Sequence, residues 1–128
     1  MVRWQKFATG FLVDIGSQAS MHDAQAQCLA IGGGLATVQT QAEAANFMLV
    51  RKSPSSGYYI GATDETVEGQ FKWLSGANWT EPVPFWAPGQ PNNTLGTQDC
   101  VELDGQLWYT IECSEVRHFI CEYVPLIV

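Results

Sequence analysis

Four cysteines are the residues whose chemistry limits the interpretation most. They are Cys28, Cys100, Cys113 and Cys121, in a chain of 128 residues. An even number predicts disulfide bonds, and four cysteines allow three pairings. Zinc coordination is the competing chemistry, but zinc ligands usually come in close CxxC or HxxxH pairs, and the chain has neither. Disulfides form in oxidising compartments, so we expect a protein that is secreted or lies on the extracellular side of the cell surface.

Acidic side chains are the next candidates for chemistry. Asp64 and Glu68 could act as a carboxylate pair of the glycosidase kind, but no cleft pattern accompanies them. No serine has the setting of a nucleophile elbow, and no cysteine is left as a reactive thiolate if all four are paired. The sequence therefore favours a binding protein over an enzyme.

Composition and charge exclude two classes of partner. Hydrophobic residues make up 46% of the chain and aromatic residues 12%, which is enough for a packed core. The formal net charge is −7, whereas nucleic acid binding needs a basic face. No apolar run approaches the roughly 18 residues needed to cross a bilayer, so we expect no membrane insertion. The length fits a single domain over residues 1–128, and sequons at Asn78 and Asn92 fit an extracellular setting.

Local signals predict two helices and several short strands. Ser20 precedes apolar residues at helical spacing, and Thr40 with Glu43 forms a capping box. The pair Asp104-Gly105 is a strong signal for a tight hairpin. The expected helices cover residues 20–31 and 40–52, and the expected strands cover 6–13, 58–62, 71–74, 100–103, 106–109 and 118–123.

A long segment, residues 75–99, has no usable periodicity. Loops longer than about 15 residues are uncommon in compact domains and are usually functional or disordered. This one carries Trp79, Phe85 and Trp86, which disordered segments seldom do. We therefore expect an ordered loop that forms the binding site. Trp73 and Trp108 are predicted to be core residues, whereas Trp86 could either pack under the loop or offer a face for stacking.

A series of short motifs occurs in a fixed order along the chain. They are Tyr59-Ile60-Gly61, Glu68-Gly69-Gln70-Phe71, Trp73, Gln90-Pro91-Asn92, Asp99-Cys100, Leu107-Trp108, Cys113 and Cys121-Glu122. Together they resemble a C-type lectin-like domain, and they are most similar to the short form found in mannose-binding proteins. The resemblance covers residues 6–123.

The resemblance implies an α+β fold with two helices around two small antiparallel sheets and a long loop region. It also implies two disulfides, Cys28–Cys121 and Cys100–Cys113. A cis bond between Gln90 and Pro91 is a further expectation of the family.

In lectins of this family, a calcium ion in the long loop binds sugar hydroxyls directly. The ligand motif there is Glu-Pro-Asn or Gln-Pro-Asp, whereas this chain has Gln90-Pro91-Asn92, which has no carboxylate. Gln98 replaces the usual Glu, and Tyr109-Thr110 replaces the usual Asn-Asp. Because carboxylates supply most of the affinity for calcium, we expect no calcium in this primary site. A sugar would then be held by hydrogen bonds from the amides.

An accessory calcium site is better preserved. The family pattern carries over onto Asp64, Glu68 and Asp99, with Asn93 and Gln98 where acids are frequent. Three carboxylates and two amide oxygens could hold one calcium ion that braces the loop. The alternative is a solvated acidic loop without an ion, and the sequence leaves both interpretations open.

The expected function is extracellular recognition of a glycan or a cell-surface glycoprotein through the long-loop face. The alternative is calcium-independent binding of a protein, because family members that lost the loop carboxylates frequently recognise proteins. A homo-oligomer would form through the domain's own surface, and the apolar tail Leu126-Ile127-Val128 is a candidate contact.

Overall fold

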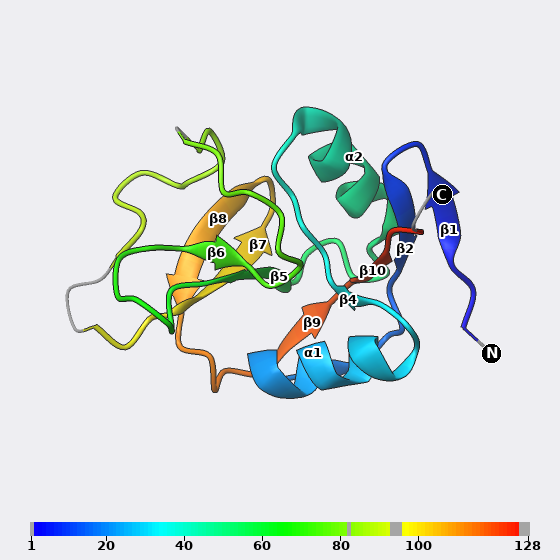
Figure 1. Cartoon of the computed structure of the whole chain (residues 1–128), viewed down its shortest axis with the longest axis horizontal. Coiled ribbons are helices and arrows are strands. Elements are labelled where there is room, and N and C mark those ends of the chain that lie inside the picture. Colours follow the sequence, from blue (N-terminus) through cyan, green and yellow to red (C-terminus); the bar gives the residue numbers. More distant parts are fainter. Residues whose placement is uncertain (1, 82, 93–95, 126–128) are drawn as a thin grey trace.

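The computed structural model describes residues 2–81, 83–92 and 96–125. It has two helices, α1 (Met21–Ala30) and α2 (Gln41–Val50). The strands are β1 (Gln5–Phe7), β2 (Gly10–Val13), β3 (Gln18–Ala19), β4 (Gly34–Leu35), β5 (Tyr58–Thr63), β6 (Lys72–Trp73), β7 (Cys100–Asp104), β8 (Leu107–Ile111), β9 (Arg117–Phe119) and β10 (Cys121–Tyr123). Figure 1 shows the loop region between β6 and β7 at one end of the molecule and both ends of the chain at the other.

The two helices begin in different ways. At α2 the predicted capping box is confirmed: the Glu43 N–H donates to Thr40 Oγ1 at 3.1 Å, and the Thr40 N–H donates to Glu43 Oε1 at 3.1 Å. At α1 Ser20 occupies the capping position, but its side chain makes no cap hydrogen bond. The Met21 N–H instead donates to the carbonyl of Cys113 at 3.0 Å, so a tertiary contact satisfies this exposed amide.

The strands form two sheets. One has the order β1-β2-β10-β4, and the other has the order β3-β9-β5-β7-β8 with β6 beside β5. The pairs are antiparallel as expected, except that β5 and β9 run parallel. The hairpin predicted at Asp104-Gly105 is confirmed, with Asp104 opposite Leu107.

Two predicted strands are divided in the structure. The segment expected as one strand, 6–13, is the hairpin of β1 and β2, because the chain reverses between Phe7 and Gly10. Gly10 has φ 138°, a conformation that glycine adopts readily. The last predicted strand, 118–123, divides at Ile120 into β9 and β10, which belong to different sheets.

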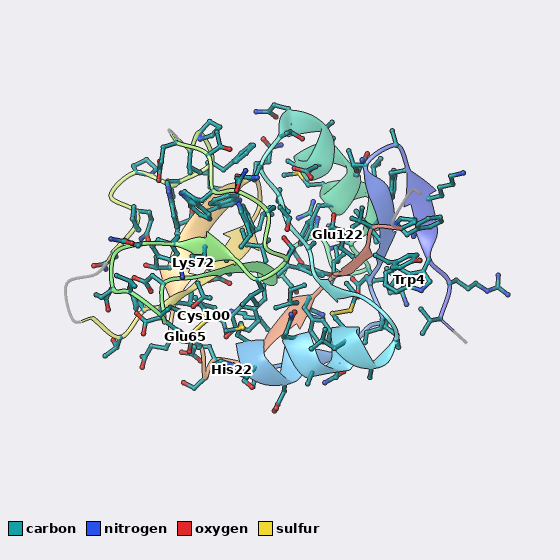
Figure 2. The ribbon with its side chains drawn as sticks, viewed as in Figure 1. Trp4, His22, Glu65, Lys72, Cys100 and Glu122 are labelled. Atoms are coloured by element: carbon teal, nitrogen blue, oxygen red, sulfur yellow. A yellow bond between two sulfur atoms is a disulfide. The ribbon has the colours of Figure 1, made fainter. Side chains whose placement is uncertain are left out.

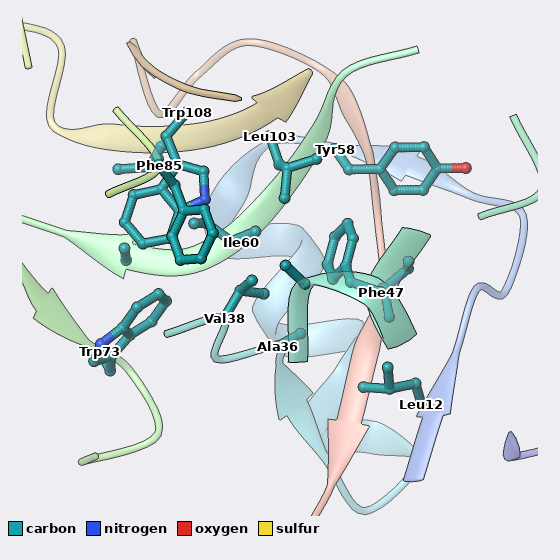
Figure 3. Close-up of a cluster of buried hydrophobic side chains, with 14 of the residues drawn as sticks. Leu12, Ala36, Val38, Phe47, Tyr58, Ile60, Trp73, Phe85, Leu103 and Trp108 are labelled. Atoms are coloured by element: carbon teal, nitrogen blue, oxygen red, sulfur yellow. The ribbon is translucent and has the colours of Figure 1, made fainter. Parts of the chain in front are cut away.

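Buried side chains form two clusters. One lies between α2 and the larger sheet and includes Phe47, Ile60 and Trp108 (Figure 3). The other surrounds the Cys28–Cys121 disulfide, which joins α1 to β10. The second disulfide, Cys100–Cys113, links the start of β7 to the segment after β8, so both expected pairings are confirmed. Within the described residues, no helix has the length and hydropathy needed to span a membrane.

Candidate binding site in the long loop

The long loop is held against the larger sheet. No helix or named strand occurs among its described residues, but two backbone hydrogen bonds join it to β8. The Trp108 N–H donates to the carbonyl of Phe85 at 2.8 Å, and the Ala87 N–H donates to the carbonyl of Trp108 at 3.0 Å. The peptide bond between Gln90 and Pro91 is cis, as the resemblance implies.

Aromatic side chains fill the space under the loop. Trp73 and Trp108 are 4% and 1% exposed, so the prediction that they are core residues is confirmed. Trp86 is half-buried, and its ring meets that of Trp108 edge-on with centroids 5.3 Å apart. Trp86 therefore packs under the loop and still leaves part of its surface in solvent.

One buried hydroxyl, Thr110 Oγ1, is approached by the side chains of Gln90 and Gln98 and by the backbone of Asn92. Gln90 Oε1 lies 2.9 Å from it and Gln98 Oε1 lies 3.2 Å from it. The backbone N–H of Asn92 donates to the same hydroxyl at 3.1 Å. Thr110 is only 4% exposed, so this hydroxyl serves as an internal connector between the loop and β8.

The side-chain oxygen of Gln90 already has donors within the protein. The backbone N–H of Thr110 donates to Gln90 Oε1 at 3.0 Å, and the Thr110 hydroxyl can donate its one proton to the same oxygen. A cation binds to oxygens, not to N–H groups, and here protein donors already point at the oxygen of Gln90. With no carboxylate present, the arrangement does not fit a calcium ion.

Tyr109 does not join this frame. In β8 the side chains of Trp108 and Thr110 are buried on the side that faces the loop. Side chains of successive strand residues point to opposite faces of a sheet, so the Tyr109 ring lies on the other face. The sequence placed Tyr109 and Thr110 together because they are adjacent, but strand alternation separates them.

The acidic residues Asp64, Glu68 and Asp99 form a cluster beside this frame. One carboxylate oxygen from each lies within 4.8 Å of the other two. Asp64 is 1% exposed, and its Oδ2 accepts the Gly69 N–H at 2.9 Å. Oδ1 of Asp64 and Oδ1 of Asp99 are buried and have no hydrogen-bond partner among the residues that the structure describes. Two buried acceptors of this kind in one cluster favour the binding of a cation.

The closeness of these carboxylates raises the pKa values of Glu68 and Asp99. A hydrogen bond to Asp64, together with the charges of Asp64 and Asp99, raises the pKa of Glu68 to about 7. Burial and the neighbouring Asp64 also raise the pKa of Asp99. Near neutral pH the cluster therefore favours either a shared proton or a bound cation.

The remaining predicted calcium ligands are Asn93 and Gln98. Asn93 lies outside the described residues, and the carbonyl oxygen of Gln98 points to Thr110 instead. Glu65 pairs with His22 on α1, with Oε2 and Nε2 2.9 Å apart, as Figure 2 shows beside Cys100. The sequence carried no signal for this last contact, because the partners are 43 positions apart.

The family model for the C-type lectin domain matches residues 17–123 of the chain. The chain belongs to the C-type lectin domain family. Among curated relatives, the domain is 34% identical to mouse (Mus musculus) C-type lectin domain family 4 member E over 100 residues, which is 74% of this chain and 46% of that protein. It is 32% identical to chicken (Gallus gallus) hepatic lectin, over 83% of this chain and 51% of that protein. The lectin domain therefore spans about half the length of these two relatives.

A solved structure confirms the fold over nearly the whole chain. The mouse scavenger receptor C-type lectin carbohydrate-recognition domain superimposes with a TM-score of 0.80 and 26% identity. The match covers 98% of this lectin domain and 96% of that chain. The two helices, the two sheets and the loop region are thus those of a C-type lectin fold.

Proposed function

We propose that this lectin domain recognises carbohydrate through the long-loop face without calcium in the primary site. Support comes from lectin relatives and from a structural neighbour titled a carbohydrate-recognition domain. The observation that carries the proposal is the convergence of Gln90, Asn92 and Gln98 on Thr110. Protein hydrogen bonds hold the loop frame where the family's ion would otherwise do so, and the exposed parts of the amides face the sugar.

The acidic cluster is the place where the lectin domain would take a calcium ion. Calcium–oxygen distances of about 2.3–2.6 Å allow two ligands to lie up to about 5 Å apart, and the three carboxylates meet that limit. Asp64, Glu68 and Asp99 would be the protein ligands. The ion would neutralise the cluster and hold Asp64 and Asp99 together. The backbone already joins them, because the Asp64 N–H donates to the Asp99 carbonyl at 3.0 Å. It would brace the loop and not contact the sugar.

A glycan array probed with and without a calcium chelator tests this function. Carbohydrate binding that survives chelation is the expected result. The contradicting result is binding that depends on calcium both in the wild type and in the Asp64→Asn variant. It would mean that an ion occupies the primary frame.

A second candidate is calcium-independent recognition of a protein. It is favoured by the buried, self-bonded state of Thr110, which removes one hydroxyl from contact with any ligand. The same array separates the two candidates, because a protein-binding domain would bind no glycan in either condition.

The cellular location, the domain organisation and the oligomeric state are further parts of the proposal. All four cysteines are paired in disulfides, so we place the lectin domain in an oxidising, extracellular compartment. We also propose that residues 1–128 act as one binding domain with no catalytic step. A homo-oligomer remains a proposal, and the tail 126–128 suggested for it lies outside the described residues.

A further inference from the structure

A second, aromatic concavity lies beside Pro91 of the long loop. Its volume is about 480 Å³. Its lining includes Phe71, Trp79, Trp86 and Pro91, with the polar side chains Gln70 and Glu81 at the edge. We refer to it as the tryptophan groove. Pro91, which lines the groove, directly follows Gln90 of the neutral frame.

Both tryptophans of the groove are held in place. Trp79 stacks on Phe71 with ring centroids 5.9 Å apart and planes at 27°. Its Nε1–H donates to Glu81 Oε1 at 2.7 Å. Trp86 is fixed edge-on between Phe71 and Trp108, at 5.4 and 5.3 Å. Because these contacts fix the rings, a ligand would not need to order them.

The chemistry of the groove combines apolar faces with hydrogen-bonding groups at its edge. The negative face of an indole attracts weakly positive C–H groups. A carboxylate has two oxygens, so Glu81 can accept a hydroxyl as well as the Trp79 N–H, and an O–H···carboxylate bond is charge-assisted. The Gln70 amide, which is exposed, offers both a donor and an acceptor.

We propose that the tryptophan groove is a sugar subsite, in which a neutral hexopyranose stacks its C–H face on Trp79 and Trp86 while its hydroxyls bind Glu81 and Gln70. This inference rests on the proposed carbohydrate function and assigns it a place and a ligand class. A galactopyranoside suits the groove, because one face of its ring carries a contiguous set of C–H bonds. A methyl α-mannopyranoside has an axial oxygen on each face and stacks less well.

The competing ligand for such a site is a quaternary ammonium ion, since aromatic rings and a carboxylate also attract cations. One feature favours the sugar: the exposed Gln70 amide adds a neutral donor that a cation cannot use. Choline therefore serves as a probe that distinguishes the two classes.

The experiment is an NMR titration of the whole lectin domain labelled with ¹⁵N and freed of any N-linked glycan, because the Asn78 sequon adjoins Trp79. The chain has five tryptophans, so five indole N–H signals are expected, assigned by single Trp→Phe variants. Methyl β-galactopyranoside should shift the signals of Trp79 and Trp86 but not that of Trp4. Trp4 lies at the opposite end of the molecule, as Figure 2 shows.

Variants test each part of the contact. Glu81→Gln keeps an acceptor for the Trp79 N–H but removes the charge, and it should weaken galactoside binding roughly fivefold. Trp79→Ala removes a stacking face and should weaken binding about fivefold or more. Gln70→Ala changes only an exposed side chain. It therefore still tests the contact with the sugar if the Trp79→Ala variant does not fold. The matched control is Glu112→Gln, an exposed carboxylate outside the loop that should leave binding unchanged.

The outcomes separate this inference from the function on which it rests. Galactoside binding that is lost in the groove variants supports the sugar subsite. Glycan binding by the wild type that these variants leave unchanged overturns the subsite but leaves the carbohydrate function standing. Choline binding without saccharide binding overturns the ligand class, and the absence of any glycan binding by the wild type overturns both.

Discussion

Thr110 and Gln90 are joined twice: the backbone N–H of Thr110 lies 3.0 Å from Gln90 Oε1, and the Thr110 hydroxyl lies 2.9 Å from the same oxygen. In this way β8 holds the start of the Gln90-Pro91-Asn92 motif. The same hydroxyl accepts the Asn92 N–H at 3.1 Å, so a single buried side chain fixes both ends of the motif.

Thr110→Val should therefore destabilise the loop and the domain. Valine keeps the shape but removes the acceptor of the Asn92 N–H and a donor to Gln90. We expect a loss of about 1–2 kcal/mol in the free energy of unfolding, measured by urea denaturation. Thr97→Val, at an exposed position of the same loop, is the control and should change stability by less than about 0.5 kcal/mol. Equal effects at both positions would show that the Thr110 hydroxyl has no structural role.

Calcium should stabilise the domain through the acidic cluster. If the dissociation constant lies between about 0.1 and 1 mM, 10 mM calcium adds roughly 1.4–2.7 kcal/mol to the free energy of unfolding. The melting temperature measures this gain. Asp64→Asn should abolish it, whereas Asp104→Asn, an exposed residue at the β7–β8 hairpin, should not. A wild-type melting temperature that is insensitive to calcium would favour the solvated acidic loop.

Restoring carboxylates should restore calcium to the primary frame. In the double variant Gln90→Glu with Gln98→Glu, two acidic side chains replace the amides whose oxygens now lie 2.9 and 3.2 Å from Thr110 Oγ1. Without calcium their repulsion should lower stability, and with calcium a second binding event should appear by calorimetry. The wild type should show at most one event, so two events in the wild type would contradict the assignment.

Local chemistry was predictable from the sequence where neighbouring residues supply it. The Thr40–Glu43 capping box and the Asp104-Gly105 hairpin are formed by residues within a few positions of each other, and both are present. The early hairpin was missed because Ala8-Thr9 is not a typical turn pair. The failure of Ser20 to cap α1 depends on Cys113, which lies far along the chain.

The proximity of the candidate residues was predictable, but their contacts were not. The family resemblance grouped Gln90, Asn92, Gln98 and Thr110, and they lie together in the structure. It could not show that these groups bind one another, because that depends on the register of β8 against the loop. The sequence raised Trp86 as a face for stacking, but it could not show the tryptophan groove, because Gln70 and Glu81 line it together only after the chain has folded.

Glu122 on β10 should make stability depend on pH. Burial raises the pKa of its carboxyl to about 7, from an ordinary value of 4.5, although the Thr37 N–H that it accepts acts in the opposite direction. A raised pKa means that the folded state holds the proton more tightly than the unfolded state. The free energy of unfolding should therefore fall as pH rises from about 4.5 to 7.

Glu122→Gln tests this dependence. The variant keeps an acceptor for the Thr37 N–H without the buried charge, so at pH 8 we expect it to be more stable than the wild type by about 2 kcal/mol. The difference should vanish near pH 4. Glu112→Gln, which removes an exposed carboxylate, is the control. A variant that is less stable than the wild type at both pH values would show that Glu122 is favourably charged in the folded state.

The most direct test of the central claim is the affinity of Asp64→Asn for a glycan bound by the wild type, measured with calcium and with chelator. This variant lacks the accessory site, so any remaining calcium dependence must come from the primary frame. The expected result is the same affinity in both conditions. An affinity that collapses on chelation would show that Gln90, Asn92 and Gln98 hold a sugar-binding calcium ion and would contradict the account.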